Sequence, residues 1–137
     1  MFQKTLTNPS SLHKPFGYSH VATAEDARLI FLAGQVALDR DGTLVGRDDY
    51  PAQVRQVFAN LGDALAAAGA TFRDVIKMNY YCADVVPADI QLDAVRAVRD
   101  SLFDGAAPPA STFVVIRRLA RPEFLIEIEA VAAIRVP

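Results

Sequence analysis

The chain has 137 residues, of which 52% are hydrophobic, and this length and composition fit one domain with a substantial core. A formal net charge of −2 and a pI near 5.6 give no basic surface for nucleic acid or an anionic membrane, so we expect neither partner. A single cysteine and two histidines exclude an internal disulfide and a histidine-rich metal site.

The N-terminal segment, up to about residue 17, predicts an irregular arm, because turn-forming residues crowd Asn8–Ser11 and Lys14–Gly17. No segment has the apolar run of a signal peptide or of a membrane-spanning helix, so we expect a soluble, cytoplasmic protein. The chain shows no internal repeat and no break in composition. We therefore expect a single domain over residues 1–137.

Two extended segments follow the arm, at Tyr18–Thr23 and Arg28–Val36, and the turn between them predicts that they pair as a hairpin. Gly34 interrupts the β-branched and aromatic run of the second segment. A glycine inside a strand marks either a β-bulge or a place where a ligand or another backbone comes close. Both interpretations stay open on the sequence alone.

Two amphipathic helices alternate with the next strand. The first begins behind the acidic residues and proline of positions 48–51 and runs to Gly69, with apolar residues at three- and four-residue steps. The strand is predicted at Val75–Cys82, where Cys82 should be an inert buried thiol. The second helix begins at residues 87–89. Arg96 and Arg99 should point outward from it, and its buried side should comprise Leu92, Val95, Val98 and Leu102.

The chain ends with two strands, Thr112–Ile116 and Phe124–Ile134, separated by a turn. The order β-β-α-β-α-β-β predicts an α+β fold in which both helices cover one face of a mixed sheet. The other face carries apolar and aromatic groups and needs a cover of its own. Self-association through that face is the economical solution.

Two carboxylates lie on the last strand. In an extended chain Glu127 and Glu129 share one face, and the isoleucines beside them share the other. A carboxylate on a partly apolar face reaches solvent, pairs with a base or belongs to a functional site. For Glu127 the pairing partner would be Arg117 or Arg118 across the last hairpin, and this is the alternative to a role in a site.

The chain carries, in order, the segments Gly17–His20, Phe31–Val36, Val75–Lys77, Pro109–Thr112 and Leu119–Val131. Together they resemble the Rid family, also called YjgF or L-PSP endoribonuclease, and the resemblance runs from about residue 17 to residue 134. It implies a chorismate-mutase-like α+β subunit that assembles as a homotrimer. It also implies small-molecule pockets in the clefts between the subunits.

The best-characterised members of that family hydrolyse enamine and imine products of pyridoxal-phosphate enzymes to a keto acid and ammonia, without metal or cofactor. In them an arginine clamps the substrate carboxylate and a tyrosine lines the pocket. A backbone carbonyl at a strand glycine faces the imine nitrogen, and a glutamate positions water. The resemblance places the tyrosine at Tyr18, the glycine at Gly34 and the glutamate at Glu127, whereas Ser111 stands at the arginine position.

The serine matters because an arginine binds a carboxylate through two charge-assisted hydrogen bonds, whereas the Ser111 hydroxyl offers one neutral bond. The loss in anchoring free energy is roughly 2 kcal/mol or more, so we expect a simple imino acid to be held poorly. By sequence, only a basic group from a neighbouring chain or His20 offers a substitute. A histidine at position 20 more often satisfies a local hydrogen bond than acts as a catalyst.

Two functions remain open. The first is hydrolytic deamination of a reactive enamine or imine in a cleft between subunits, with Glu127 as general base and Tyr18 as a substrate contact. The alternative is a non-catalytic trimer that senses or sequesters a small molecule, with neutral polar contacts from Ser111 and Thr112. For Tyr18 the alternative to a role in a site is that of an ordinary interface aromatic. Ribonuclease activity fits poorly, because the chain has no basic groove and no paired histidines.

Overall fold

The computed structural model describes all residues from Met1 to Pro137. In chain order the elements are β1 (Gln3–Thr7), β2 (Val21–Glu25), β3 (Ala27–Gln35), α1 (Tyr50–Ala67), the short 3-10 helix η1 (Phe72–Asp74), β4 (Val75–Ala83), α2 (Ala88–Phe103), β5 (Ala110–Ile116) and β6 (Ile126–Arg135). Neither α-helix is long and apolar enough to cross a membrane.

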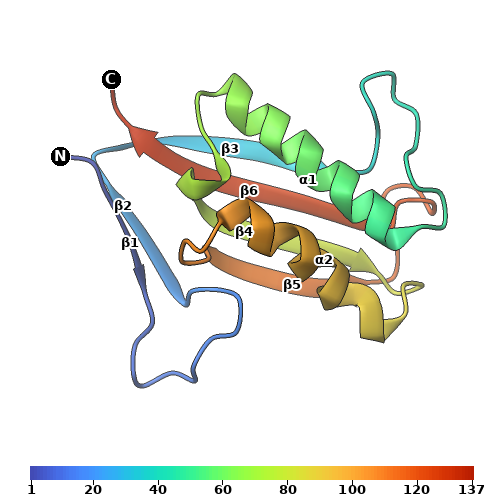
Figure 1. Cartoon of the computed structure of the whole chain (residues 1–137), viewed down its shortest axis with the longest axis horizontal. Coiled ribbons are helices and arrows are strands. Elements are labelled where there is room, and N and C mark those ends of the chain that lie inside the picture. Colours follow the sequence, from blue (N-terminus) through green and yellow to red (C-terminus); the bar gives the residue numbers. More distant parts are fainter.

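The main sheet has the strand order β3-β6-β4-β5. The β4 and β5 strands run parallel, whereas β6 is antiparallel to both of its neighbours, so the sheet is mixed as predicted. Both helices cover the same face (Figure 1), and this confirms the predicted α+β arrangement. We call the face under α1 and α2 the helix face and the opposite one the open face.

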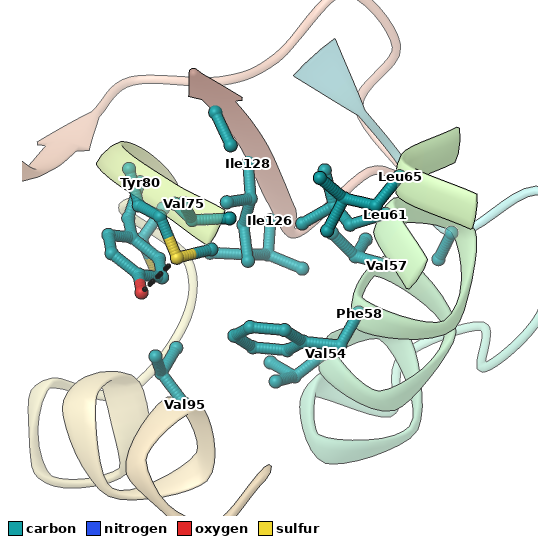
Figure 2. Close-up of a cluster of buried hydrophobic side chains, with 14 of the residues drawn as sticks. Val54, Val57, Phe58, Leu61, Leu65, Val75, Tyr80, Val95, Ile126 and Ile128 are labelled. Atoms are coloured by element: carbon teal, nitrogen blue, oxygen red, sulfur yellow. Dashed lines mark hydrogen bonds between the residues drawn. The ribbon is translucent and has the colours of Figure 1, made fainter. Parts of the chain in front are cut away.

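The core lies between the helices and the helix face. Asp49 caps the N-terminus of α1, because its side chain accepts a hydrogen bond of 3.0 Å from the Ala52 N–H, and a proline stands in the first turn of the helix. Its apolar stripe packs against fully buried isoleucines of β6 (Figure 2). Full burial stabilises each such side chain by about 1.5–3 kcal/mol. Cys82 is buried in the same core, as predicted, and burial raises its thiol pKa.

The arm up to about residue 17 was predicted to be irregular, and this is wrong for residues Gln3–Thr7. These residues form β1 and pair antiparallel with β2 in a separate two-stranded sheet. The turn-rich composition on which the prediction rested begins only at Asn8. Before it, exposed and half-buried residues alternate, which is the pattern of a strand with one covered face.

The predicted hairpin between the first two extended segments is also wrong. β2 pairs with β1 and β3 pairs with β6, so the two segments lie in different sheets. Only Asp26, in the left-handed region at φ +50°, separates β2 from β3. One residue is too short to reverse the chain into a hairpin, which needs a loop of two or more residues. The chain therefore bends at Asp26, and the two strands diverge (Figure 1).

A third correction concerns α2. Its buried residues are Val95, Arg99 and Phe103, at steps of four, whereas Leu92 is 40% exposed. Arg99, expected to point outward, is only 9% exposed. Arginine tolerates this position because its long apolar stem packs in the interior while the guanidinium meets a counter-charge, here Asp100.

Candidate functional site

Gly34 and Glu127 are in direct contact on the open face. The register of β3 against β6 shifts between Leu32 and Gln35, so Gly34 lies in a β-bulge. A Cβ atom at position 34 would overlap Glu127 Oε1 and lie 2.9 Å from its Cδ. The β-bulge interpretation of this glycine is therefore confirmed, and what comes close to it within the chain is the Glu127 carboxylate, not another backbone.

The two acids of β6 have different surroundings. Glu129 accepts hydrogen bonds from the Tyr81 hydroxyl at 2.7 Å and from Asn79 Nδ2 at 3.1 Å, and these lower the pKa of its carboxyl group. Glu127 receives no hydrogen bond and forms no ion pair within the chain, so its expected alternative pairing with Arg117 or Arg118 is absent. Glu127 is therefore the acid of this face that is free to bind a ligand or a water molecule.

Tyr18 and Ser111 line a common cavity of about 290 Å³ on the helix side of the sheet, between α2, the start of β5 and the loop that carries Tyr18. Phe113 and Tyr80, whose rings stack with centroids 5.9 Å apart, form its apolar wall. The cavity has the size and mixed lining of a site for a small metabolite.

Ser19 ties Tyr18 to the start of β5. Its backbone N–H donates to the Pro109 carbonyl at 3.0 Å, and its hydroxyl donates to the Pro108 carbonyl at 2.5 Å. Ser19 is buried and forms an isolated parallel bridge with Ala110. This connection fixes residue 18 beside position 111, although the two are far apart in the sequence.

Both histidines of the chain gather around Tyr18. His13 Nε2 and the Tyr18 hydroxyl are 2.5 Å apart, and His20 stacks edge-on against both rings. His20 Nε2 lies 2.8 Å from the His13 carbonyl, so it satisfies a local hydrogen bond as expected. His13 was not singled out in the sequence, because its only signal is a position five residues before the tyrosine.

Thr112 lies on the opposite face of β5 from Ser111. It accepts a hydrogen bond of 3.0 Å from Lys77 Nζ on the open face. Successive residues of a strand face opposite sides, so Ser111 and Thr112 of one chain do not line the same cavity. The His, Cys, Asp and Glu side chains form no group of three or more that could hold a metal ion.

The expected site residues therefore form two separate pairs within one chain. Tyr18 and Ser111 share a cavity on the helix side, beside the edge strand β5. Gly34 and Glu127 meet on the open face, beside the other edge strand, β3. A single chain does not bring the two pairs together.

The cavity of Tyr18 and Ser111 also contains two cations from the same chain, Arg96 and Arg99. This corrects the expectation that only His20 or a neighbouring chain offers a basic group near position 111. The sequence does hold a signal for it. Arg96, Arg99 and Phe103 continue from Leu92 at steps of three and four, which places all of them along one side of α2.

Comparisons with known proteins agree with this architecture. The profile of the family described as Endoribonuclease L-PSP matches residues 9–134. The chain is 32% identical over 131 residues to the RutC family protein YjgH of Escherichia coli, covering 95% of this chain and 96% of that protein. It is 34% identical over 121 residues to the RutC family protein slr0709 of Synechocystis, covering 88% of each. A crystal structure of YyfB from Yersinia pestis, of the conserved Rid protein family, matches with a TM-score of 0.87 at 41% identity, covering 96% of this chain and 98% of that chain.

Proposed function

This chain belongs to the Endoribonuclease L-PSP family, which we call the Rid family, and from that premise we propose that it hydrolyses a reactive enamine or imine to a carbonyl compound and ammonia. The reaction takes place in a cleft between subunits of a homotrimer. Glu127 is the general base, and Tyr18 and Gly34 contact the substrate. No metal or cofactor takes part.

The observation that carries the proposal is the contact between Glu127 and Gly34. In this contact the Glu127 carboxylate, which has no hydrogen-bond or ion-pair partner in the chain, lies against the backbone of the edge strand β3. Water held by Glu127 attacks the imine carbon and gives a proton to the carboxylate, which passes it to the imine nitrogen to form the carbinolamine. Glu127 then takes the proton of the carbinolamine hydroxyl and returns it to the amino group, so that the C–N bond breaks and the carbonyl compound and ammonia are released. Imine hydrolysis has a modest barrier, so positioning of water and substrate supplies much of the acceleration.

The exposed apolar residues of the open face support the assembly. Phe31 is 74% exposed on β3, and Leu29 and Val114 are also exposed. A cluster of this kind is typical of a surface that a partner subunit covers. A neighbouring subunit would also solve the separation of the site residues, since the Tyr18 and Ser111 pair of one chain can face the Gly34 and Glu127 pair of the next.

The test is an imine-hydrolysis assay with a matched pair of variants. Imines of different side chains are generated in the cuvette by an amino-acid oxidase, and semicarbazide competes for them. The wild type should lower the yield of semicarbazone and speed the release of ammonia. Glu127→Gln should reduce this acceleration on the order of 100-fold, because it removes the general base. Glu129→Gln, on the same strand and face, should keep it.

The binding alternative has its own outcome in this experiment. No acceleration for any imine, together with a small molecule that raises the melting temperature, would leave only a sensing or sequestering trimer. The two histidines of the chain do lie together, with ring centroids 4.8 Å apart, contrary to the expectation that none are paired. RNA cleavage, the activity in the name of the family profile, still finds less support, because the chain has a net charge of −2 and the one lysine of the open side, Lys77, lies beside the carboxylate of Glu129. Cleavage that survives repurification and disappears in Glu127→Gln would reverse this judgement.

A further inference from the structure

The cavity beside Ser111 contains two guanidinium groups that no sequence motif assigns. Arg99 is almost completely buried, and Arg96, one helical turn earlier on α2, is partly exposed at the entrance. Ser111 adds a hydroxyl donor to the same lining, whereas the hydroxyl groups of Tyr18 and Tyr80 are already hydrogen-bonded to His13 Nε2 and Met78 Sδ. The two guanidinium groups and the Ser111 hydroxyl can donate hydrogen bonds, and guanidinium groups cannot accept one. The lining therefore suits an anionic group.

Arg99 is held in a fixed position. Its Nε and Nη2 atoms donate to Asp100 Oδ1 at 3.1 and 2.9 Å, and no hydrogen bond of the structure uses Nη1. Gly17, at φ +76°, lies against the guanidinium, and a Cβ atom there would stand 2.7 Å from Nη2. Burial raises the pKa of Tyr80 to about 12, and the adjacent Arg99 opposes that rise. The pocket thus holds a preorganised cation with unused donor capacity.

Arg96 completes the pair at the entrance. Its guanidinium lies over the exposed Phe16 ring, 5.9 Å from the centroid, and 3.7 Å from Asp93. The carboxylates of Asp93 and Asp100 are both well exposed, so water and salt screen their charges. A ligand inside the cavity therefore meets the two arginines more strongly than it meets the two acids.

We propose that Arg96 and Arg99, together with the Ser111 hydroxyl, bind the carboxylate of a small substrate and so replace the arginine that is missing at position 111. As a statement about the substrate this rests on the proposed function, and it names the class as imines or enamines of 2-oxo acids. The cation comes from the helix behind the strand instead of from the strand. A planar guanidinium fork from α2 reaches the same pocket wall as an arginine at position 111 would.

Binding of the reaction product tests the subsite without catalysis. Isothermal titration should detect 2-oxobutanoate and give much weaker binding for butanone, which has the same carbonyl but no carboxylate. Arg96→Gln and Arg99→Lys should each weaken the binding of 2-oxobutanoate by about tenfold to hundredfold, because the first removes a positive charge and the second replaces the planar guanidinium fork with an ammonium that cannot bind a carboxylate through two parallel hydrogen bonds. The control is Arg55→Gln on α1, which removes an exposed arginine away from the cavity and should leave affinity unchanged.

A buried arginine is also a structural element, so folding is followed separately by circular dichroism and thermal melting. If Arg99→Lys does not fold, two other measurements test the subsite. The first is the affinity of Arg96→Gln for 2-oxobutanoate, and the second is the side-chain Nε–H NMR signals of both arginines in the wild-type protein. These two signals should shift with 2-oxobutanoate and stay in place with butanone. Equal affinity for the two compounds, or wild-type affinity in Arg96→Gln, would overturn the subsite.

The outcomes also separate this subsite from the proposed deamination. Binding of 2-oxobutanoate that depends on the arginines, without hydrolysis of any imine, would keep the subsite and refute the proposed function. Hydrolysis with equal KM for imines with and without a carboxylate would keep the function and refute the subsite. If the subsite and the proposed function are both correct, Arg96→Gln raises KM for the substrate with a carboxylate about tenfold or more. It leaves kcat, and KM for the substrate without a carboxylate, unchanged.

Discussion

The carboxylate of Glu127 occupies the space that a side chain at position 34 would fill, so Gly34 and Glu127 are sterically coupled across the β3–β6 pair. The contact joins two residues far apart in the sequence and needs no hydrogen bond or charge. It leaves the carboxylate oxygens free for a water molecule. The absence of a side chain at Gly34 therefore makes room for the Glu127 carboxylate, and a change at either residue should have the same functional consequence.

Gly34→Ala should keep the fold and lose deaminase activity. The new Cβ meets the far end of a flexible side chain, so the Glu127 carboxylate should move while the backbone stays. Misplacement of a reacting group by about 1 Å costs on the order of 100-fold in rate. The imine-hydrolysis assay measures this, and Gly34→Ala should fall to the level of Glu127→Gln.

Gly62→Ala is the matched control for that variant. Gly62 lies inside α1, and an added Cβ would make an ordinary contact of 3.4 Å with the Phe72 ring. Alanine should raise the free energy of unfolding by about 0.5–1 kcal/mol, because glycine is the poorer helix former. Full activity in Gly34→Ala would show that the position of Glu127 does not matter for catalysis.

Tyr81→Phe should raise the pKa of Glu129 toward the ordinary glutamate value. The Tyr81 hydroxyl bond is the largest cause of the present lowering, and Asn79 supplies the rest. A lowered folded-state pKa contributes stability above the unfolded pKa, and this is lost as the pH falls through the folded pKa. The wild type should therefore lose more stability than Tyr81→Phe between about pH 7 and about pH 3.

NMR titration of the glutamate side-chain carboxyl carbons measures the shift directly. Glu123 provides an internal control, because its pKa is lowered by its own backbone N–H and by Arg121, far from Tyr81 in the sequence. Its titration should be the same in both proteins. An unchanged Glu129 titration in Tyr81→Phe would mean that the hydroxyl does not hold this carboxylate in solution.

Ser19→Ala should loosen the loop that carries Tyr18. It leaves the Pro108 carbonyl without its donor, which costs about 1–3 kcal/mol of unfolding free energy for a buried group. Because the loop positions Tyr18 in the cavity, KM should rise more than kcat falls. Ser101→Ala is the control. Its hydroxyl donates to a carbonyl of the previous helical turn on the exposed side of α2, and its removal should be nearly neutral.

Local signals explain why the helices and most strands could be predicted. The acid and proline at the start of α1 and its apolar periodicity lie within one stretch of chain, and in the structure Asp49 caps that helix as expected. Strand partners are not local. The failed hairpin depended on whether β3 gains more from β2 or from β6, and the long, mostly apolar β6 offers a longer ladder and a buried face.

The candidate site divides in the same way. Gly34 and Glu127 stand out because a glycine within a strand and acids on a strand face are each visible in a short segment. The burial of Arg99 depends on Gly17, a residue on the loop before β2 that allows the guanidinium to approach. Helical periodicity places Arg99 on a side of α2. It does not tell which distant loop covers that side, and so the cation was assigned to solvent.

Phe31→Lys should dissociate the proposed homotrimer into folded monomers. Phe31 projects from the open face without contributing to the core, so a monomer does not need it. A lysine buried in an interface without a partner costs several kcal/mol, which exceeds what most subunit contacts can offset. Size-exclusion chromatography with light scattering should give about a third of the wild-type mass, and imine hydrolysis should fall with it. Val85→Lys changes an equally exposed apolar residue between β4 and α2 and should keep both. A wild-type protein that is monomeric at every concentration would have no inter-subunit cleft. The Tyr18 and Ser111 pair could then not face the Gly34 and Glu127 pair, and the proposed site would not exist.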